Sequence, residues 1–354
     1  MTTPSPIQQL ADDIRSLQSQ IGDMQTSVRL TKVRDTIEDV QSVINGLVQR
    51  IATCRTRGYV FEKNLENQAQ ELTKSWALLY PNLQTQLNIQ SAGLQNSLRP
   101  IESQLQQLAA AANNPAFAHG LLVSVQNNTK ILEDKVSAAE KTIDGMYDQV
   151  SDRISQFTRH LDEIDYLLSQ LAEASFQLLP TEAGVAAVKA IWCKTGKEQK
   201  GDPEGILFLT DQRIIFEQKE EIVTKKVLFV ATEKQKVQQL QIETPILKVE
   251  KVDTSKQGFL KNEDHIEIRF SSGAPVEVAH FHIWQDNSAW QQLINRALSK
   301  DFDKDRAVGI DQSALDKVKG APSQCPSCGG NITQVLLRGM DSLTCEYCGF
   351  VIRL

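Results

Sequence analysis

Two cysteine pairs near the end of the chain constrain its folding more than any other sequence feature. Cys325-Pro-Ser-Cys328 and Cys345-Glu-Tyr-Cys348 are separated by 16 residues. Each pair puts two thiols on one tight turn, and four thiolates around one ion leave no coordination position open for water. The spacing is a zinc signature. It predicts one structural Zn²⁺ held by Cys325, Cys328, Cys345 and Cys348.

Two disulfides are the alternative for the same four cysteines. The N-terminal residues Met-Thr-Thr-Pro-Ser-Pro have neither the basic nor the apolar part of a secretion signal. We therefore expect a reducing, cytoplasmic compartment, which favours metal over disulfides.

Residues 322–354 resemble a zinc ribbon in their cysteine spacing. The resemblance predicts a short hairpin over residues 332–343, with its turn near Gly339. So short a segment buries too little apolar surface to fold alone, and metal binding would supply roughly 10 kcal/mol or more of folding free energy.

Length and charge limit the class of protein. The chain has 354 residues and a net charge of −6, enough for two or three domains and without the basic character of nucleic-acid binders. No run of 18 apolar residues occurs, so we expect no helix that crosses a membrane.

The first half of the chain has helical periodicity. Apolar residues alternate in steps of three and four, which is the seam of a coiled coil: Ile7, Leu10, Ile14, Leu17, Ile21, Met24 and Val28. The phase slips near Leu30, as a stutter within one helix or as a hinge between two. Pro81 and Pro100 each predict a kink or a helix start, and Asn113-Asn114-Pro115 predicts a stop.

We interpret residues 1–178 as an all-α coiled coil or helical bundle. A long helix is expected from about Gly120 to Gln177, where apolar residues form two adjacent stripes typical of a bundle. An intermolecular coiled coil, which would make a homo-oligomer, and an intramolecular bundle both stay open at this point.

The periodicity changes from helical to alternating at Pro180. Residues 183–300 contain eight candidate strand segments, interpreted as seven or so antiparallel strands, and one amphipathic helix from about Asp286 to Ser299, capped by Asp286 or Asn287. The predicted strands are 185–191, 205–210, 213–216, 227–230, 237–242, 246–252, 265–270 and 276–282.

This order resembles a pleckstrin-homology (PH) β-barrel with a C-terminal helix. The phrase Gly205-Ile-Leu-Phe-Leu-Thr-Asp-Gln-Arg-Ile-Ile-Phe216 is similar to the "GxLxLTxxRxxF" hairpin of GRAM domains, a branch of that superfamily. The resemblance implies a domain without catalytic residues that binds phosphoinositides or proteins. Residues 301–321 are interpreted as a linker with a short helix from about Asp311 to Lys319.

Basic residues that could reach anionic lipid are present but are offset by acids. Each lysine near an anionic membrane surface contributes about 1 kcal/mol, and neighbouring acids reduce it, so a solvated loop is the favoured interpretation. The candidates are Lys194, Lys197 and Lys200 in the first inter-strand loop, with Lys225 and Lys226.

Two histidines, His280 and His282, share a face of the last predicted strand. Metal ligands usually come in sets of three or four, and no third ligand has a matching spacing, so a metal pair is the less favoured interpretation. Cys54 and Cys193 are expected to be buried small side chains.

The sequence therefore predicts a non-enzymatic interaction or scaffold protein. It would oligomerise through its helices and dock protein partners through a PH-like domain and a zinc ribbon. A peripheral membrane protein that binds phosphoinositide or other anionic lipid, and a zinc-ribbon regulator associated with nucleic acid, are the alternatives. The net charge disfavours nucleic acid.

Overall fold

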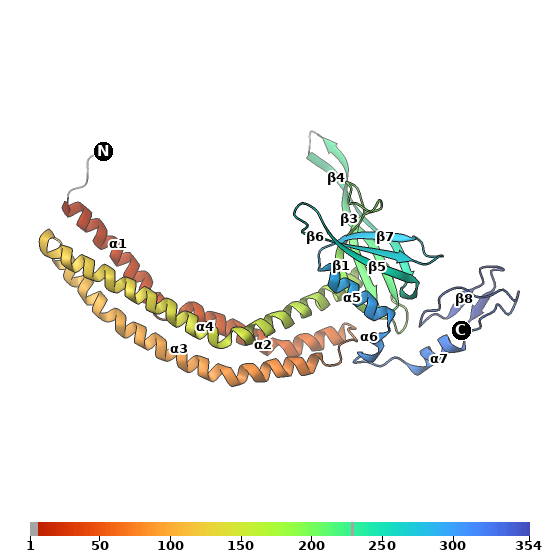
Figure 1. The fold of residues 1–354 in the computed structure, drawn as a ribbon, viewed down its shortest axis with the longest axis horizontal. Coiled ribbons are helices and arrows are strands. Elements are labelled where there is room, and N and C mark those ends of the chain that lie inside the picture. The colour runs from red at the N-terminus through yellow and green to blue at the C-terminus, as the bar shows by residue number, and fades with distance from the viewer. Residues whose placement is uncertain (1–5, 228–229) are drawn as a thin grey trace. The chain divides into compact units, whose positions relative to one another are not determined.

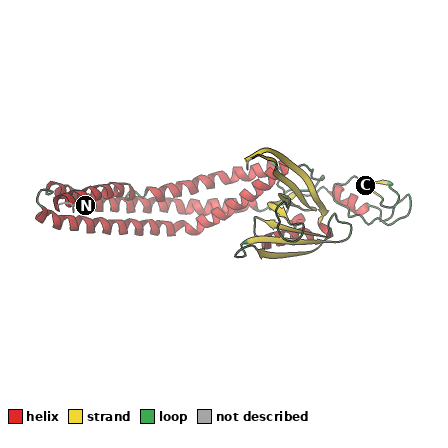
Figure 2. Cartoon of the chain, turned by 90° about the horizontal axis from the view of Figure 1, so that it is seen from above, coloured by secondary structure: helices red, strands yellow, loops and turns green. Residues whose placement is uncertain are grey.

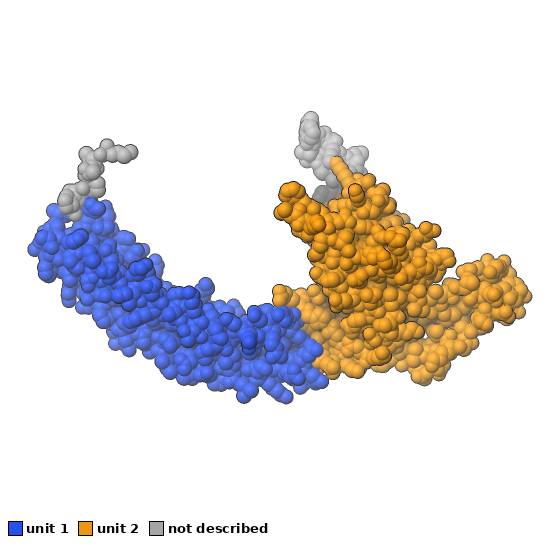
Figure 3. Space-filling model, viewed as in Figure 1, with its two compact units in different colours: residues 1–49, 67–158 blue, residues 50–66, 159–354 orange. Residues whose placement is uncertain are grey.

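The fold is described from a computed structural model, which describes residues 6–227 and 230–354 and gives only the backbone for residues 6, 222–227 and 230–234. The chain divides into two compact units, residues 1–49 with 67–158 and residues 50–66 with 159–354 (Figure 3). Each unit is described by itself. Among the helices in the described part, none is long and apolar enough to cross a membrane.

Long helices make up the N-terminal half (Figure 1). They are α1 (Pro6–Ser27), α2 (Thr31–Thr56), α3 (Leu65–Ala110) and α4 (Pro115–Glu173). The phase slip is a break between two helices, because Leu30 lies between α1 and α2 with a φ of 53°. Leu30 is fully buried, which holds the break in place. The stop predicted at residues 113–115 is confirmed, since α3 ends at Ala110 and α4 begins at Pro115.

The heptad seam of α1 is buried within the chain itself. Ile7 is exposed, but the following seam residues are 7% exposed or less: Leu10, Ile14, Leu17, Ile21, Met24 and Val28. Hydrogen bonds link α1 and the residue just after it to α3: Gln25 donates to Glu102 at 2.7 Å, and Ser91 Oγ donates to the Val28 carbonyl at 3.0 Å. This use of the seam favours an intramolecular bundle over a coiled coil between chains.

Pro81 and Pro100 both lie inside α3, so the prediction of a helix start at either residue is wrong. Helix α3 is 46 residues long and is held by its buried face, which includes Trp76, Leu83 and Leu98. The Trp76 indole also donates to Gln41 of α2 at 2.9 Å. Packing along the whole face therefore outweighs the hydrogen bond that each proline removes.

A seven-stranded antiparallel sheet follows among the described residues (Figures 1 and 2). Its strand order is β4-β3-β2-β1-β7-β6-β5. The strands are β1 (Gly184–Trp192), β2 (Glu204–Thr210), β3 (Arg213–Val227), β4 (Val230–Pro245), β5 (Val249–Gln257), β6 (Glu263–Phe270) and β7 (Val278–Ile283). The strand predicted at 227–230 includes residues 228–229, which lie outside the described residues.

The sheet is not closed into the barrel that the sequence predicted, because β4 and β5 are its two edges. The connection between them explains this. Pro245 lacks an amide, and Ile246–Lys248 forms the 3-10 helix η1 before β5 begins. The Ile246 amide bonds to the Gln212 carbonyl in the β2–β3 turn.

One helix, α5 (Asn287–Leu298), follows β7 and packs against the sheet. The Asp286 side chain caps it by accepting from the Ala289 amide at 2.9 Å, as the sequence predicted. Trp290, Ile294 and Ala297 form its buried face. The sheet's own core includes Phe208, Phe216 and Phe281, all fully buried.

The C-terminal segment contains α6 (Asp301–Lys304), α7 (Gln312–Gly320), β8 (Ser342–Thr344) and β9 (Val351–Arg353). Strands β8 and β9 pair with each other, so the hairpin encloses the second cysteine pair. The hairpin predicted over residues 332–343 is wrong. That segment is irregular, and Gly339 (φ 85°) lies so close to Pro180 that an added Cβ would be 2.0 Å from its carbonyl oxygen.

Candidate metal centre

Four cysteines of the C-terminal segment lie together, as the spacing predicted. One sulfur from each of Cys325, Cys328, Cys345 and Cys348 lies within 4.8 Å of the others. Two of the distances are identical: Cys325 Sγ to Cys348 Sγ and Cys328 Sγ to Cys345 Sγ are both 3.7 Å. All four are free thiols rather than disulfides.

The two cysteine turns have the same backbone pattern. The Gly329 amide donates to the Cys325 carbonyl at 2.8 Å, and the Gly349 amide donates to the Cys345 carbonyl at 2.9 Å. Both glycines have a positive φ, 72° and 71°, which favours glycine after the second cysteine of each pair. The local sequence therefore builds two equivalent turns that present two sulfurs each.

The cluster fits a tetrahedral metal. A zinc–sulfur bond of about 2.3 Å in a tetrahedron separates the sulfurs by about 3.8 Å, close to the two measured 3.7 Å distances. The backbone amides of Cys348 and Tyr347, which point at the sulfur of Cys345, lower the pKa of that thiol to about 7. These amides therefore favour the thiolate of Cys345, which is the form that binds a metal.

A small apolar cluster supports the sulfurs. Leu343 on β8 and Ile352 on β9 are opposite each other and are 2% and 5% exposed. Ile332, Leu336, Met340 and Leu354 pack against this pair. The cluster contains few apolar side chains, so this segment buries little apolar surface around the sulfurs.

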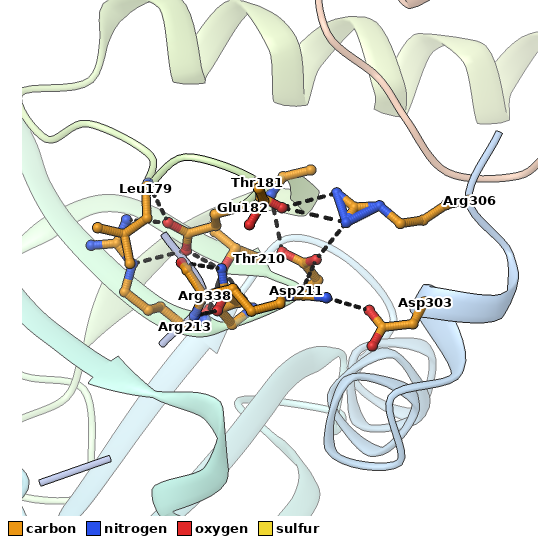
Figure 4. Close-up of polar contacts among 11 residues, drawn as sticks. Leu179, Thr181, Glu182, Thr210, Asp211, Arg213, Asp303, Arg306 and Arg338 are labelled. Carbon is orange, nitrogen blue, oxygen red and sulfur yellow. Dashed lines mark hydrogen bonds and ion pairs between the residues drawn. The ribbon is translucent and has the colours of Figure 1, made fainter. Parts of the chain in front are cut away.

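The loop between the cysteine pairs docks on the β2–β3 turn (Figure 4). The Arg338 guanidinium bonds to Asp211 of that turn and to Asp303 of α6, the latter at 2.9 Å. Gln212 bonds to both the amide and the carbonyl of Arg338. These side-chain contacts satisfy backbone groups that a hairpin would have paired, which explains why no hairpin forms there.

Asp211 lies at the centre of this junction. Its carboxylate accepts from the Ala183 amide at 3.0 Å and from Arg306 at 3.3 Å, besides Arg338. The Asp211 side chain is 1% exposed, and the Arg306 and Arg338 side chains are 6% and 11% exposed. Burial raises the pKa of Asp211, and the Ala183 amide and the two arginines oppose that rise.

The other polar residues of the predicted GRAM-like phrase are structural. Thr210 donates to Glu182 at 2.6 Å and accepts from the Arg213 amide at 2.7 Å. Arg213 is paired with the fully buried Glu182. Gly205 allows close strand contact, since an added Cβ would be 1.9 Å from the Glu217 carbonyl oxygen. The sequence identified this phrase but gave no signal that it would hold the C-terminal segment.

The structure also brings together histidine and cysteine side chains that the sequence pattern does not connect. His265 on β6 and Cys193, just after β1, lie beside His280 and His282 of β7. Burial, followed by the neighbouring rings of His282 and His280, lowers the pKa of His265. Sequence reasoning had found only the pair on β7, because cross-strand neighbours on other elements leave no spacing pattern.

The candidate lipid-binding lysines are not brought together into a pocket by the described side chains. Lys194, Lys197 and Lys200 are exposed in the β1–β2 loop, and the Lys194 ammonium lies 5.1 Å from the Trp192 ring. Lys225 and Lys226 are on β3, but their side chains lie outside the described part.

Comparison with known proteins adds little to this description. No family model matches the chain, and no curated protein is similar to it. Among solved structures, it is similar to the crystal structure of the DH/PH domains of p115-RhoGEF, with 13% identity and a TM-score of 0.21 over 84% of this chain and 95% of that chain. A TM-score this low does not establish a shared fold.

Proposed function

We propose that this chain is a non-enzymatic interaction protein that docks a protein partner. In this proposal the sheet with α5 is a PH-like domain of the GRAM type, and residues 322–354 are a zinc ribbon fixed to it. The helical region is a bundle that carries this docking unit. Support for the PH-like assignment comes from seven antiparallel strands followed by one helix.

The proposed ion of the four-cysteine cluster is one structural Zn²⁺. Cys325, Cys328, Cys345 and Cys348 would all coordinate it, and the sulfur spacing supports this. With four thiolates the ion has no position for substrate, so it would stabilise the ribbon and perform no reaction. The buried charges of the junction, Asp211 with Arg338 and Glu182 with Arg213, are paired with each other, which also supports a structural role.

The observation that carries the docking proposal is a set of exposed apolar side chains on and next to the second cysteine turn. Tyr347, Phe350 and Val351 are 69%, 46% and 55% exposed, although the ribbon around them is ordered by short hydrogen-bonded turns. Aromatic side chains on a rigid turn are typical anchors of protein interfaces. We refer to these three residues as the aromatic turn.

The charge of the ribbon favours a protein over a nucleic acid. Residues 322–354 contain two arginines against Asp341 and Glu346, so the segment is neutral. One of the arginines, Arg338, is already paired with Asp211 and Asp303. Phosphate backbones are bound mainly by clustered positive charge, which this surface lacks.

A capture experiment with full-length protein tests the proposal. Wild type should enrich a defined protein from native extract, and the double variant Tyr347→Ser, Phe350→Ser should lose it while keeping its zinc. Phe117→Ser is a matched control, because Phe117 is 63% exposed but lies on α4. Binding should then be reproduced with the purified partner.

A second candidate function, membrane binding, is favoured by one feature of the sheet domain. Phe259 and Leu260 in the β5–β6 turn are 89% and 84% exposed, and Lys261 follows them. Such a pair could insert among lipid headgroups. Sedimentation with vesicles that contain anionic lipid tests this function, and binding should be lost in Phe259→Ser, Leu260→Ser. Lys194→Glu, Lys197→Glu and Lys200→Glu would test the lysines of the β1–β2 loop.

A further inference from the structure

A second group of metal-ligand side chains lies on the sheet, away from the four cysteines. It consists of Cys193, His265 and His280, each offering one ligand atom within 4.8 Å of the others. The histidines lie on the face of β6 and β7 opposite the core residues Ile266 and Phe281, since neighbouring side chains along a strand alternate. The Cys193 amide bonds to the His280 carbonyl at 2.8 Å, which fixes the cysteine beside them.

The two rings approach each other through nitrogen atoms. His265 Nδ1 and His280 Nε2 are 3.0 Å apart. The three residues are almost inaccessible, with exposures of 1% for Cys193, 1% for His265 and 7% for His280. Two imidazole nitrogens on one tetrahedral zinc, with bonds of about 2.0–2.1 Å, lie about 3.3 Å apart. The observed spacing is therefore close to that of a chelating pair.

The outer nitrogens of both rings are unsatisfied. His265 Nε2 and His280 Nδ1 are buried and have no hydrogen-bond partner among the described residues. Each faces a carboxylate beyond hydrogen-bond distance: Glu263 lies 3.7 Å from His265 Nε2, and Glu267 lies 3.6 Å from His280 Nδ1.

Proton counting shows why this arrangement is incomplete without a cation. A neutral imidazole has one N–H. If the rings share one proton between Nδ1 and Nε2, only one outer nitrogen has a proton, and the other presents a lone pair to a carboxylate. A metal bound at the inner nitrogens would let both outer nitrogens carry protons that point toward Glu263 and Glu267. Metal-bound histidines usually donate their other ring N–H to a carboxylate in this way.

We propose that Cys193, His265 and His280 form a second metal site for a divalent first-row transition metal, with Zn²⁺ as the expected ion. The metal would bind Cys193 Sγ, His265 Nδ1 and His280 Nε2. Cysteine sulfur and histidine nitrogen are both zinc ligands, and three protein ligands leave a fourth position for water or another ligand. The proposal does not depend on the proposed function.

Gln257 is the side chain next to the proposed metal position. Its Nε2 lies 3.4 Å from His280 Nε2. Rotating the amide by half a turn would exchange its NH₂, which donates to Ser255 Oγ at 3.2 Å, for the carbonyl oxygen, which can bind a metal. Gln257 is therefore compatible with the fourth position.

A different group shares His265 but fits less well. Glu263, His265 and His282 also offer atoms within 4.8 Å of one another. The His265 and His282 rings are stacked nearly parallel, at 15°, with their centres 4.8 Å apart, so their nitrogens do not point at a common position. His282 Nδ1 is also held by Glu198 at 2.6 Å. His282 is therefore the matched control for His280 on the same strand.

Metal analysis of the full-length protein, loaded with Zn²⁺ and dialysed, tests the site. Wild type should contain about two zinc ions per chain, one in each site, since each ligand set closes around one ion. Cys193→Ser, His265→Gln and His280→Gln should each contain about one, while His282→Gln keeps two. Circular dichroism should show that each variant is folded.

Glu267→Gln should weaken metal binding without unfolding the protein, because the Glu267 side chain is only half-buried. The affinity of this variant for Zn²⁺ at the second site, measured by titration, should fall about 10–100-fold, the usual effect of removing a carboxylate that bonds to a metal-binding histidine. One zinc per chain in wild type would overturn the proposal. Loss of the second ion in His282→Gln, together with its retention in Cys193→Ser, would also overturn the proposal. The four-cysteine site is measured independently, by Cys325→Ser with Cys345→Ser, which should also lose one ion.

Discussion

Arg338, in the loop between the two cysteine pairs, is bonded to Asp211, in the turn between β2 and β3 (Figure 4). Both side chains are almost fully buried. The contact joins the C-terminal ribbon to the sheet domain, and Gln212 adds two bonds to the backbone of the same residue. The ribbon is therefore fixed to the sheet domain through a turn that the sequence suggested only as part of a hairpin.

Arg338→Ala should loosen the ribbon without releasing its metal. The change removes charge-assisted hydrogen bonds to Asp211 and Asp303 and should lower the free energy of unfolding by about 2 kcal/mol. Hydrogen exchange should rise over residues 332–341, with zinc content unchanged. Arg353→Ala, the other arginine of the ribbon, is the control and should leave exchange there as in wild type.

Asp211→Asn should be more damaging than Arg338→Ala. It leaves Arg306 and Arg338 buried without the carboxylate that both contact. Removing one partner of a buried charge network costs about 3–5 kcal/mol of unfolding free energy. Urea unfolding monitored by tryptophan fluorescence measures this loss. A variant as stable as wild type would show that the junction does not hold the domain together.

Gly339→Ala tests the close approach of the ribbon loop to Pro180. The added Cβ would lie 2.0 Å from the Pro180 carbonyl oxygen, and the residue has a φ of 85°. Strain and clash should together destabilise the docked loop by more than about 1 kcal/mol. Gly309→Ala has no atom within 4 Å of its added Cβ and should have no such effect. Thermal unfolding of both variants makes the comparison.

The contact between His160 and Glu62 should make part of the free energy of unfolding depend on pH. The neighbouring carboxylates of Glu163 and Glu62 raise the pKa of His160 to about 10, and His160 Nε2 lies 2.7 Å from Glu62. Because the folded pKa lies above the unfolded one, the stabilisation is complete below about pH 6.5 and is lost as pH rises toward about 10. His160→Gln should therefore lose more stability, relative to wild type, at about pH 6 than at about pH 10. Equal losses in urea unfolding at both pH values would contradict this.

How far the sequence predicts this structure depends on whether a pattern is local. The four cysteines and the seam of α1 are local patterns, because each depends on residues a few positions apart, and the structure has both. The cap at Asp286 is local in the same way.

What the sequence could not predict depends on residues far apart. The loop around Arg338 is irregular because Gln212 supplies its hydrogen bonds, and nothing near residue 338 indicates that. Similarly, His265 and Cys193 join His280 only after β1 and β6 have both paired with β7. The open sheet depends on how η1 directs the chain between β4 and β5, which strand periodicity does not reveal.

Capture of a protein by the aromatic turn tests the central claim most directly. Full-length wild type and Phe117→Ser should enrich the same protein from native extract, and the purified partner should bind both. Tyr347→Ser with Phe350→Ser should lose it with zinc content unchanged. Capture that is undiminished in this double variant, or no protein enriched by wild type, would contradict the proposal that the ribbon is a docking surface.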